Sequence, residues 1–299
     1  MKSIYKLKNK TTEEIKGFLF ISPWIIGFLM FRLWPVMQSF VYSFTSFNIF
    51  NPPQFIGLDN FTRMVNDPLF WKSLSVTFTY VLISVPLKLM FALFIAIILS
   101  NKLRNINLYR TIYYLPSILG SSIAISVLWK VLFMRDGVLN LFLAQLGIDG
   151  PAWLGNPDLT LFTLSLLSVW QFGSSMIIFL AGLKQIPVSL YEAAVIDGAG
   201  RLVKFFKITL PLLTPMIFFN IIMQTIGAFQ TFAAPFVIFG NSGSPLNCAL
   251  LYVINIYKFG FSYFEMGYAS ALSWVLLIIV STFSFIAFKL QKYWVYYES

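Results

Sequence analysis

Polar side chains that could contact a solute recur along one apolar stretch of the chain. Asn220, Gln224, Gly227 and Thr231 are spaced i, i+4, i+7 and i+11, which places them in one stripe on a helix. Gln230 is an outlying polar neighbour. Amides and hydroxyls are neutral donors and acceptors, so the stripe suits the hydroxyl groups of a sugar. It equally suits hydrogen bonds between packed helices, and both interpretations stay open.

Aromatic and charged side chains also lie within apolar stretches. Phe229 and Phe232 are expected to stack on the apolar face of a sugar ring. Arg32, Lys88 and Lys130 are charged, and a charge within a membrane span is a functional candidate by default. Lys130 stands near the end of its stretch, where a lysine can extend to the interface. We interpret all three as structural.

A second group of residues, between two long apolar stretches, has the composition of a contact surface. Pro187 precedes Ser189-Leu190-Tyr191-Glu192, which has the S-x-x-E form of a capping box, so we expect a short helix to begin at Ser189.

One face of this helix is expected to be unusually flat. Leu190, Ala193, Ala194 and Asp197 share that face, and the small alanines allow a partner to approach closely. Gly198 and Gly200 are expected to provide the left-handed turn that ends the helix.

The residues that usually perform catalysis are missing from the sequence. There is no histidine and one cysteine, which excludes an internal disulfide and argues against zinc chemistry and Ser-His catalysis. The sequence has no Gly-rich loop ending in Lys-Ser or Lys-Thr, so nucleotide is not bound by that route. We therefore predict no catalytic residues, no metal site and no cofactor bound by this chain.

The elements that position these residues are predicted to be membrane-spanning helices. Hydrophobic residues make up 58% of the 299-residue chain and charged residues 11%, a composition that a water-soluble surface does not tolerate. Stretches of about 20 apolar residues can span a bilayer. Six qualify, at 17–42, 73–100, 108–134, 157–183, 208–239 and 266–289. We read 17–42 as a retained first span instead of a signal peptide. The segments 17–42 and 208–239 exceed a perpendicular span, so tilt, a break at a proline or an extension into water is expected there, with Pro35 and Pro235 as candidate break points.

The distribution of charge predicts the orientation. Most of the 21 Lys and Arg residues fall on one side if the N-terminus is inside, so both termini are predicted to be cytoplasmic. The net charge of +10 follows from this topology, with anionic lipid headgroups as its counterpart. The basic residues form no continuous patch with interleaved aromatics, so no nucleic-acid partner is expected.

Glu192-Ala193-Ala194, then Gly198 after three residues, then Ile208-Thr209-Leu210-Pro211 after nine more, resembles the EAA signature loop of ATP-binding-cassette (ABC) importer permeases. The similarity is to the binding-protein-dependent permeases, within them to the maltose-type carbohydrate uptake group. Further segments resemble the same group, namely 22–24, 55–61, 114–116 and 137–140.

The resemblance implies an all-α integral membrane protein with six transmembrane helices and the fold of a type I importer transmembrane domain. It implies a non-catalytic permease subunit that forms the path for a carbohydrate in the bacterial inner membrane. The implied partners are a second, related permease, two ATPase subunits that bind ATP and Mg²⁺, and an extracellular binding lipoprotein or periplasmic binding protein. The implied ATPase-coupling residues are Tyr191, Glu192, Ala193, Ala194, Asp197, Gly198 and Arg201.

The expected organisation is a cytoplasmic segment at 1–16, a permease domain at 17–289 with its EAA loop at about 184–207, and a short tail at 290–299. Two alternatives stay open: an ABC permease for a non-sugar solute such as a polyol phosphate or polyamine, and a secondary transporter. The EAA loop argues against a secondary transporter. So does the near absence of acidic residues from the predicted spans, which contain only Asp158, at the start of the 157–183 segment.

Overall fold

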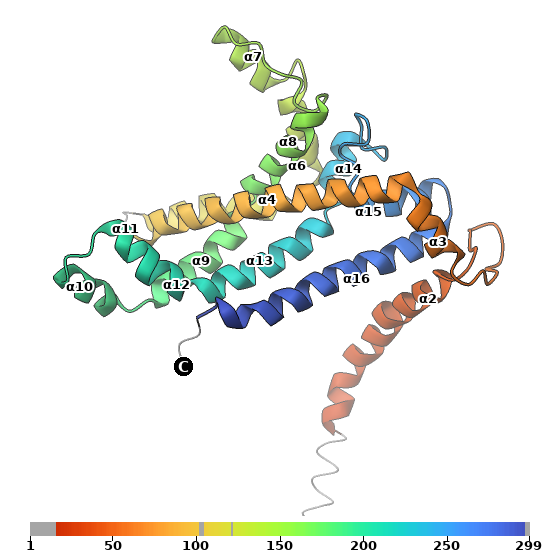
Figure 1. The fold of residues 1–299 in the computed structure, drawn as a ribbon, viewed down its shortest axis with the longest axis horizontal. Helices are drawn as coiled ribbons and strands as arrows, with labels where there is room; N and C mark the ends of the chain where they lie inside the picture. Colours follow the sequence, from red (N-terminus) through yellow and green to blue (C-terminus); the bar gives the residue numbers. More distant parts are fainter. Residues whose placement is uncertain (1–15, 102–104, 121, 297–299) are drawn as a thin grey trace, which may run out of the picture. The chain divides into compact units, whose positions relative to one another are not determined.

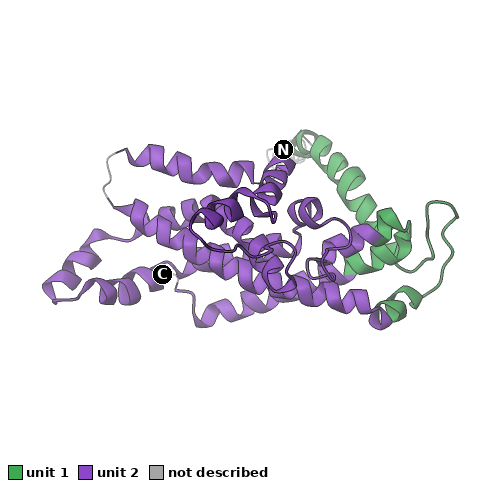
Figure 2. Cartoon of the chain, turned by 90° about the horizontal axis from the view of Figure 1, so that it is seen from above, with its two compact units in different colours: residues 1–64, 259–274 green, residues 65–258, 275–299 purple. Residues whose placement is uncertain are grey.

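The computed structural model describes residues 16–101, 105–120 and 122–296, and these residues are almost entirely helical. They contain two isolated antiparallel bridges, Thr45 with Phe55 and Asn48 with Asn51. The chain divides into two compact units, coloured in Figure 2. Unit 1 comprises residues 1–64 and 259–274, and unit 2 comprises residues 65–258 and 275–299.

Unit 1 contains the first span, a helix over 16–28 that continues through the π-helix η1 (Leu29–Leu33) into α2 (Trp34–Tyr42). The predicted break at Pro35 is replaced by this π-helical turn, in which the Trp34 N–H donates to the Leu29 carbonyl. A proline removes one helical hydrogen bond and crowds the preceding turn. A widened turn absorbs that crowding without ending the helix.

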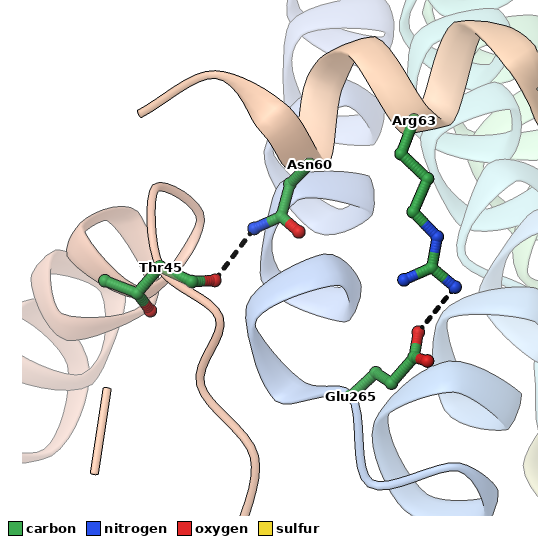
Figure 3. Close-up of polar contacts among 4 residues, drawn as sticks. All are labelled: Thr45, Asn60, Arg63 and Glu265. Carbon is green, nitrogen blue, oxygen red and sulfur yellow. Dashed lines mark hydrogen bonds and ion pairs between the residues drawn. The ribbon is translucent and has the colours of Figure 1, made fainter. Parts of the chain in front are cut away.

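A polar cluster ties the segment after α2 to residues 59–64, the unit 1 part of α3 (Asp59–Asn66), and to the start of α16 (Met266–Leu290). The buried Asn60 side chain donates to the carbonyls of Ser43 and Thr45, each at 2.9 Å. Arg63 forms an ion pair with Glu265 at 2.8 Å, and its guanidinium lies 4.4 Å from the ring centre of Tyr268. In Figure 3, Asn60 projects from α3 toward Thr45, and Arg63 projects from the same helix toward Glu265.

Unit 2 is built around α4 (Pro68–Ser100), against which α8 (Pro157–Trp170), α9 (Gly173–Gln185), α13 (Thr214–Phe229) and α15 (Tyr252–Tyr257) pack. The buried positions of α4 include small side chains, among them Ser73, Thr77, Ser84, Ala92 and Ala96. Small residues let neighbouring backbones approach closely within a membrane. This explains how one helix contacts four others.

The remaining elements complete the order in Figure 1. They are α5 (Ile106–Leu119), α6 (Ile123–Phe133), α7 (Val138–Gln145), α10 (Val188–Ile196), α11 (Arg201–Lys204), η2 (Phe205–Thr209), α12 (Leu210–Leu212), α14 (Ala233–Phe239), η3 (Lys258–Ser262) and η4 (Gln291–Tyr293).

The described helices confirm the all-helical membrane fold. Four are long and apolar enough to cross a membrane: Lys16–Tyr42, Pro68–Ser100, Thr214–Phe239 and Met266–Tyr293. Two further pairs qualify if each bent pair is one span, which gives up to six. These pairs, Ile106–Leu119 with Ile123–Gln145 and Pro157–Trp170 with Gly173–Gln185, bend by 95° and 51°. They overlap the predicted segments 108–134 and 157–183.

Three spans are interrupted, and only one interruption was expected. The break in the 208–239 segment lies at residues 230–232, ahead of Pro235 instead of at it. Pro235 occupies the first turn of α14, where its missing N–H has no helical partner to lose. The breaks after Gly120 and at Gln171 were not predicted, because apolar composition continues across both.

Candidate functional site

The first candidate site is helix α10, which carries Glu192, Ala193 and Ala194. The helix begins at Val188, with Pro187 as its N-cap and no side-chain capping bond. The predicted capping box at Ser189 is therefore wrong. Pro187 has the non-helical ψ of an N-cap residue, 131°, but its ring has no oxygen that could accept a capping bond.

The end of α10 is built on Gly198. The Ala199 N–H donates to the Ala194 carbonyl at 2.8 Å, and the Gly198 N–H donates to the Val195 carbonyl at 3.0 Å. With Gly198 at φ +76°, this is a Schellman motif. Gly200 has φ −67° and caps α11, so the prediction that it shares the left-handed turn is wrong.

The surface of α10 is uncovered by the rest of the described chain. The helix has no buried residue, and the apolar side chains of Val188, Val195 and Ile196 are 68%, 59% and 86% exposed. Glu192 and Ala193 are exposed, while Tyr191 and Ala194 are partly covered. Asp197 and Arg201 are exposed on either side of the glycine turn. Six of the seven predicted coupling residues thus lie on α10 and the glycine turn that follows it, and Arg201 is the first residue of α11.

One contact links α10 to the start of the fifth span. The hydroxyl oxygens of Tyr191 and Thr209 lie 2.9 Å apart. Thr209 is buried and ends the π-helix η2, directly before α12 and α13. The connection passes through the Ile208-Thr209-Leu210-Pro211 segment that completes the EAA-type signature.

The second candidate site is a cavity of about 320 Å³ within unit 2, at the lower end of the range of small-ligand pockets. All three helix breaks reach it, through Gly120, Gln171 and Thr231. The Gln171 amide donates to the Gly120 carbonyl at 3.0 Å, and Ser117 Oγ donates to the Gln171 carbonyl at 3.0 Å. Irregular backbone at membrane depth is tolerated where it is buried in protein or lines a wet cavity.

The predicted polar stripe is divided by the structure. Gln224, Gly227 and Thr231 line the cavity. Asn220 is fully buried, and its side chain donates to the Met216 carbonyl of its own helix. Gln230 is exposed and does not line the cavity. Asn220 therefore does not face the cavity, and the path interpretation is kept for the other three stripe residues.

The two aromatic candidates, Phe229 and Phe232, have different environments in the structure. Phe232 lines the cavity. Phe229 is buried and packs edge-to-face on Phe78, with ring centres 5.2 Å apart. Stacking of Phe229 on a solute is thus wrong, because its ring is already covered by the helix packing.

Several lining residues were missed by sequence reasoning. Tyr80, Lys88, Ser126, Ser168 and Gln171 come from α4, α6 and the end of α8. The signal for Lys88 was present, since it is a charge within a span, but it was assigned a structural role. The others are single polar residues in apolar stretches, and only the tertiary arrangement brings them together.

The chain is similar to known membrane transport proteins. Residues 65–295 match the family model described as binding-protein-dependent transport system inner membrane component. The probable ABC transporter permease protein YesP of Bacillus subtilis is 53% identical over 98% of this chain and 96% of that protein. The arabinooligosaccharides transport system permease protein AraP of Bacillus subtilis is 35% identical over 94% of this chain and 90% of that protein.

A solved structure shares the fold. A chain of the bacterial alginate ABC transporter, crystallised with an alginate pentasaccharide-bound periplasmic protein, superposes with a TM-score of 0.82. It is 22% identical, and the match covers 96% of this chain and 97% of that one. The importer transmembrane fold and the inner-membrane location are both confirmed. On the family match and these two relatives, the chain belongs to the family of binding-protein-dependent transport system inner membrane components.

Proposed function

We propose that this chain is a permease subunit of an ABC importer and forms part of the path for a carbohydrate. In this proposal an extracellular binding protein delivers the solute, and a second, related permease completes the path. Two separate ATPase subunits bind ATP and Mg²⁺ and hydrolyse the nucleotide. The permease chain itself performs no covalent chemistry.

The observation that carries this proposal is the isolation of α10. A nine-residue helix is too short to be stable alone in water, and this one exposes Val188, Val195 and Ile196. Exposed apolar side chains gathered on one element mark a contact surface. An ATPase subunit that covers this helix would remove that surface from water.

The way α10 is attached makes it suitable for transmitting force. It is connected in sequence to α9 at one end and to α11 at the other, and Tyr191 contacts Thr209 beside α12. A rigid element held at several points moves its attachments with it when its docking surface shifts. ATP can favour one state of the importer only if it binds that state more tightly.

The chemistry of the cavity supports a carbohydrate. Gln171, Gln224, Ser168 and Thr231 offer amides and hydroxyls, which are suitable partners for sugar hydroxyls. Phe232 adds an aromatic face. The relative AraP is named for arabinooligosaccharides, which agrees with a sugar substrate here.

Affinity purification of the chain in mild detergent from its native membrane tests the proposal. We expect an ATPase and a second EAA-bearing permease to stay bound, and the complex to hydrolyse ATP faster when the loaded binding protein is added. Recovery of the chain alone, still active in solute uptake, would overturn the proposal in favour of a self-sufficient transporter.

A further inference from the structure

The cavity contains one basic side chain, that of Lys88. The sixteen residues that line it include no Asp, Glu or Arg, and Lys88 is the one residue among them that is charged at neutral pH. Lys88 has no ion pair in the part of the chain that the structure describes. The cavity wall contributed by this chain is therefore positively charged.

Lys88 stands too deep in its helix to be explained as an interfacial anchor. It is twelve residues before the end of α4 at Ser100, or roughly 18 Å at 1.5 Å per residue. The hydrocarbon core of a bilayer is about 30 Å thick, so this distance places Lys88 in its interior. A lysine at that depth is costly and is kept where it faces a polar cavity or a partner.

Lys130 provides a useful contrast within the same unit. It is also an intramembrane lysine, but its ammonium donates to the Val237 carbonyl at 3.5 Å and it does not line this cavity. A backbone acceptor accounts for Lys130. No such acceptor accounts for Lys88 among the described residues.

The helix breaks do not by themselves favour one sign of charge. At each break one helix ends and another begins, so carbonyl acceptors and N–H donors meet at the same place. The amides and hydroxyls of the wall are neutral. Selection by charge therefore depends on Lys88, whose ammonium has three donors and no acceptor.

We propose that Lys88 binds the carboxylate of the transported solute, and that the solute is an acidic saccharide carrying a uronic acid. Neighbouring amides and hydroxyls, including Gln171, Gln224 and Ser168, bind the hydroxyl groups of the same sugar. A charge-assisted hydrogen bond inside a low-dielectric site is stronger than a neutral one. This assignment rests on the importer function proposed above.

The test uses the complete importer, with this chain, its partner permease, the ATPase subunits and the binding protein, reconstituted into liposomes. The probes are uronate disaccharides and their methyl esters, which differ in charge and little in size. The binding protein can itself prefer one of the two probes, so its affinity for each probe is measured separately. The uptake rate of the acid divided by that of the ester is then divided by the ratio of these two affinities, which gives a corrected ratio for the permease.

We expect the wild-type importer to prefer the acid, and Lys88→Met to lower the corrected ratio by about tenfold, the effect of losing one charge-assisted contact. Lys88→Arg should keep the preference, because it keeps the charge. Lys130→Met, the matched control, should leave the ratio unchanged. Gln224→Glu places a carboxylate in the same wall and should also remove the preference, even if Lys88→Met does not assemble.

Two failures are distinguishable. If the assembled complex hydrolyses ATP but imports neither acidic nor neutral saccharides, the proposed carbohydrate function is wrong and the assignment of Lys88 falls with it. If saccharides are imported but the corrected ratio does not favour the acid, or is the same in wild type, Lys88→Met and Gln224→Glu, only the assignment of Lys88 is wrong.

Discussion

Tyr191 and Thr209 are joined by a hydroxyl contact of 2.9 Å across eighteen residues of sequence. Tyr191 lies on the uncovered helix α10, and Thr209 is buried in the π-helical turn η2 that leads into the fifth span. Thr209 also donates to the Lys204 carbonyl at 3.4 Å, within the same turn. A displacement of α10 is therefore expected to reach α13 through this turn as well as through the chain ends.

Removal of the Tyr191 hydroxyl should loosen the coupling without unfolding the protein. Tyr191→Phe keeps the ring and loses one hydrogen bond, which contributes about 0.5–1.5 kcal/mol. We expect more ATP hydrolysed per solute imported, measured in liposomes. Thr209→Val removes the other hydroxyl, and the double variant should resemble either single variant, because both break the same contact. Strictly additive effects would show that the contact does not carry the coupling.

The docking surface can be tested by adding charge to two positions of α10. Ala194→Asp introduces a carboxylate and extra volume at the partly covered small residue, so ATPase binding and solute-stimulated hydrolysis should fall while membrane insertion is kept. Ser189→Asp adds a charge on the exposed side of the helix that carries Ile196, seven residues further on, and should also weaken ATPase binding. The docking role would be rejected if both variants copurify with the ATPase at the wild-type level.

The two glycines after α10 allow a test of backbone conformation alone. A Cβ at Gly198 or at Gly200 would meet no neighbour within 4 Å, but only Gly198 has a positive φ, of +76°. Gly198→Ala should therefore cost about 1–2 kcal/mol in the local turn, misplace the end of α10 and lower stimulated ATPase activity. Gly200→Ala, at φ −67°, should have little effect. Equal activities in the two variants would mean that the left-handed turn is not needed for docking.

Hydropathy predicted the four long spans and the two regions that form bent helix pairs, because the apolar stretches are long and their composition changes at loops. Helical periodicity correctly grouped Gln224, Gly227 and Thr231 on one wall. Asn220 shares their face but lies about 6 Å further from the break at 1.5 Å per residue, where the helices pack closely. Periodicity gives direction around a helix, but it does not show where along the helix a cavity ends.

The breaks at Gly120 and Gln171 depend on contacts that only the fold creates. Each break exposes backbone groups, and Gln171 satisfies a carbonyl of the other span. The position of Lys88 on the cavity wall could not be predicted for a related reason, since the sequence showed the missing acidic partner but not the cavity that its side chain lines. Gln171 and Gly120 are 51 residues apart, and most of the residues that line the cavity with Lys88 are more than about 70 residues from it in sequence.

The polar cluster of unit 1 gives a prediction about stability in which burial decides the order of effects. Asn60 is 5% exposed and satisfies two backbone carbonyls. Asn60→Leu keeps a similar volume but leaves both carbonyls without this donor, at about 1–3 kcal/mol for each buried group. The thermal midpoint of the purified importer should fall clearly.

Glu265→Gln supplies the comparison for Asn60→Leu. The side chains of Arg63 and Glu265 are 49% and 38% exposed, and a pair this open to solvent contributes about 0–1 kcal/mol. Arg63 also keeps its contact with the Tyr268 ring in this variant. We therefore expect a smaller fall in the thermal midpoint than for Asn60→Leu, measured in the same detergent and salt. A larger fall for Glu265→Gln would mean that the ion pair, and not the buried amide, stabilises this cluster.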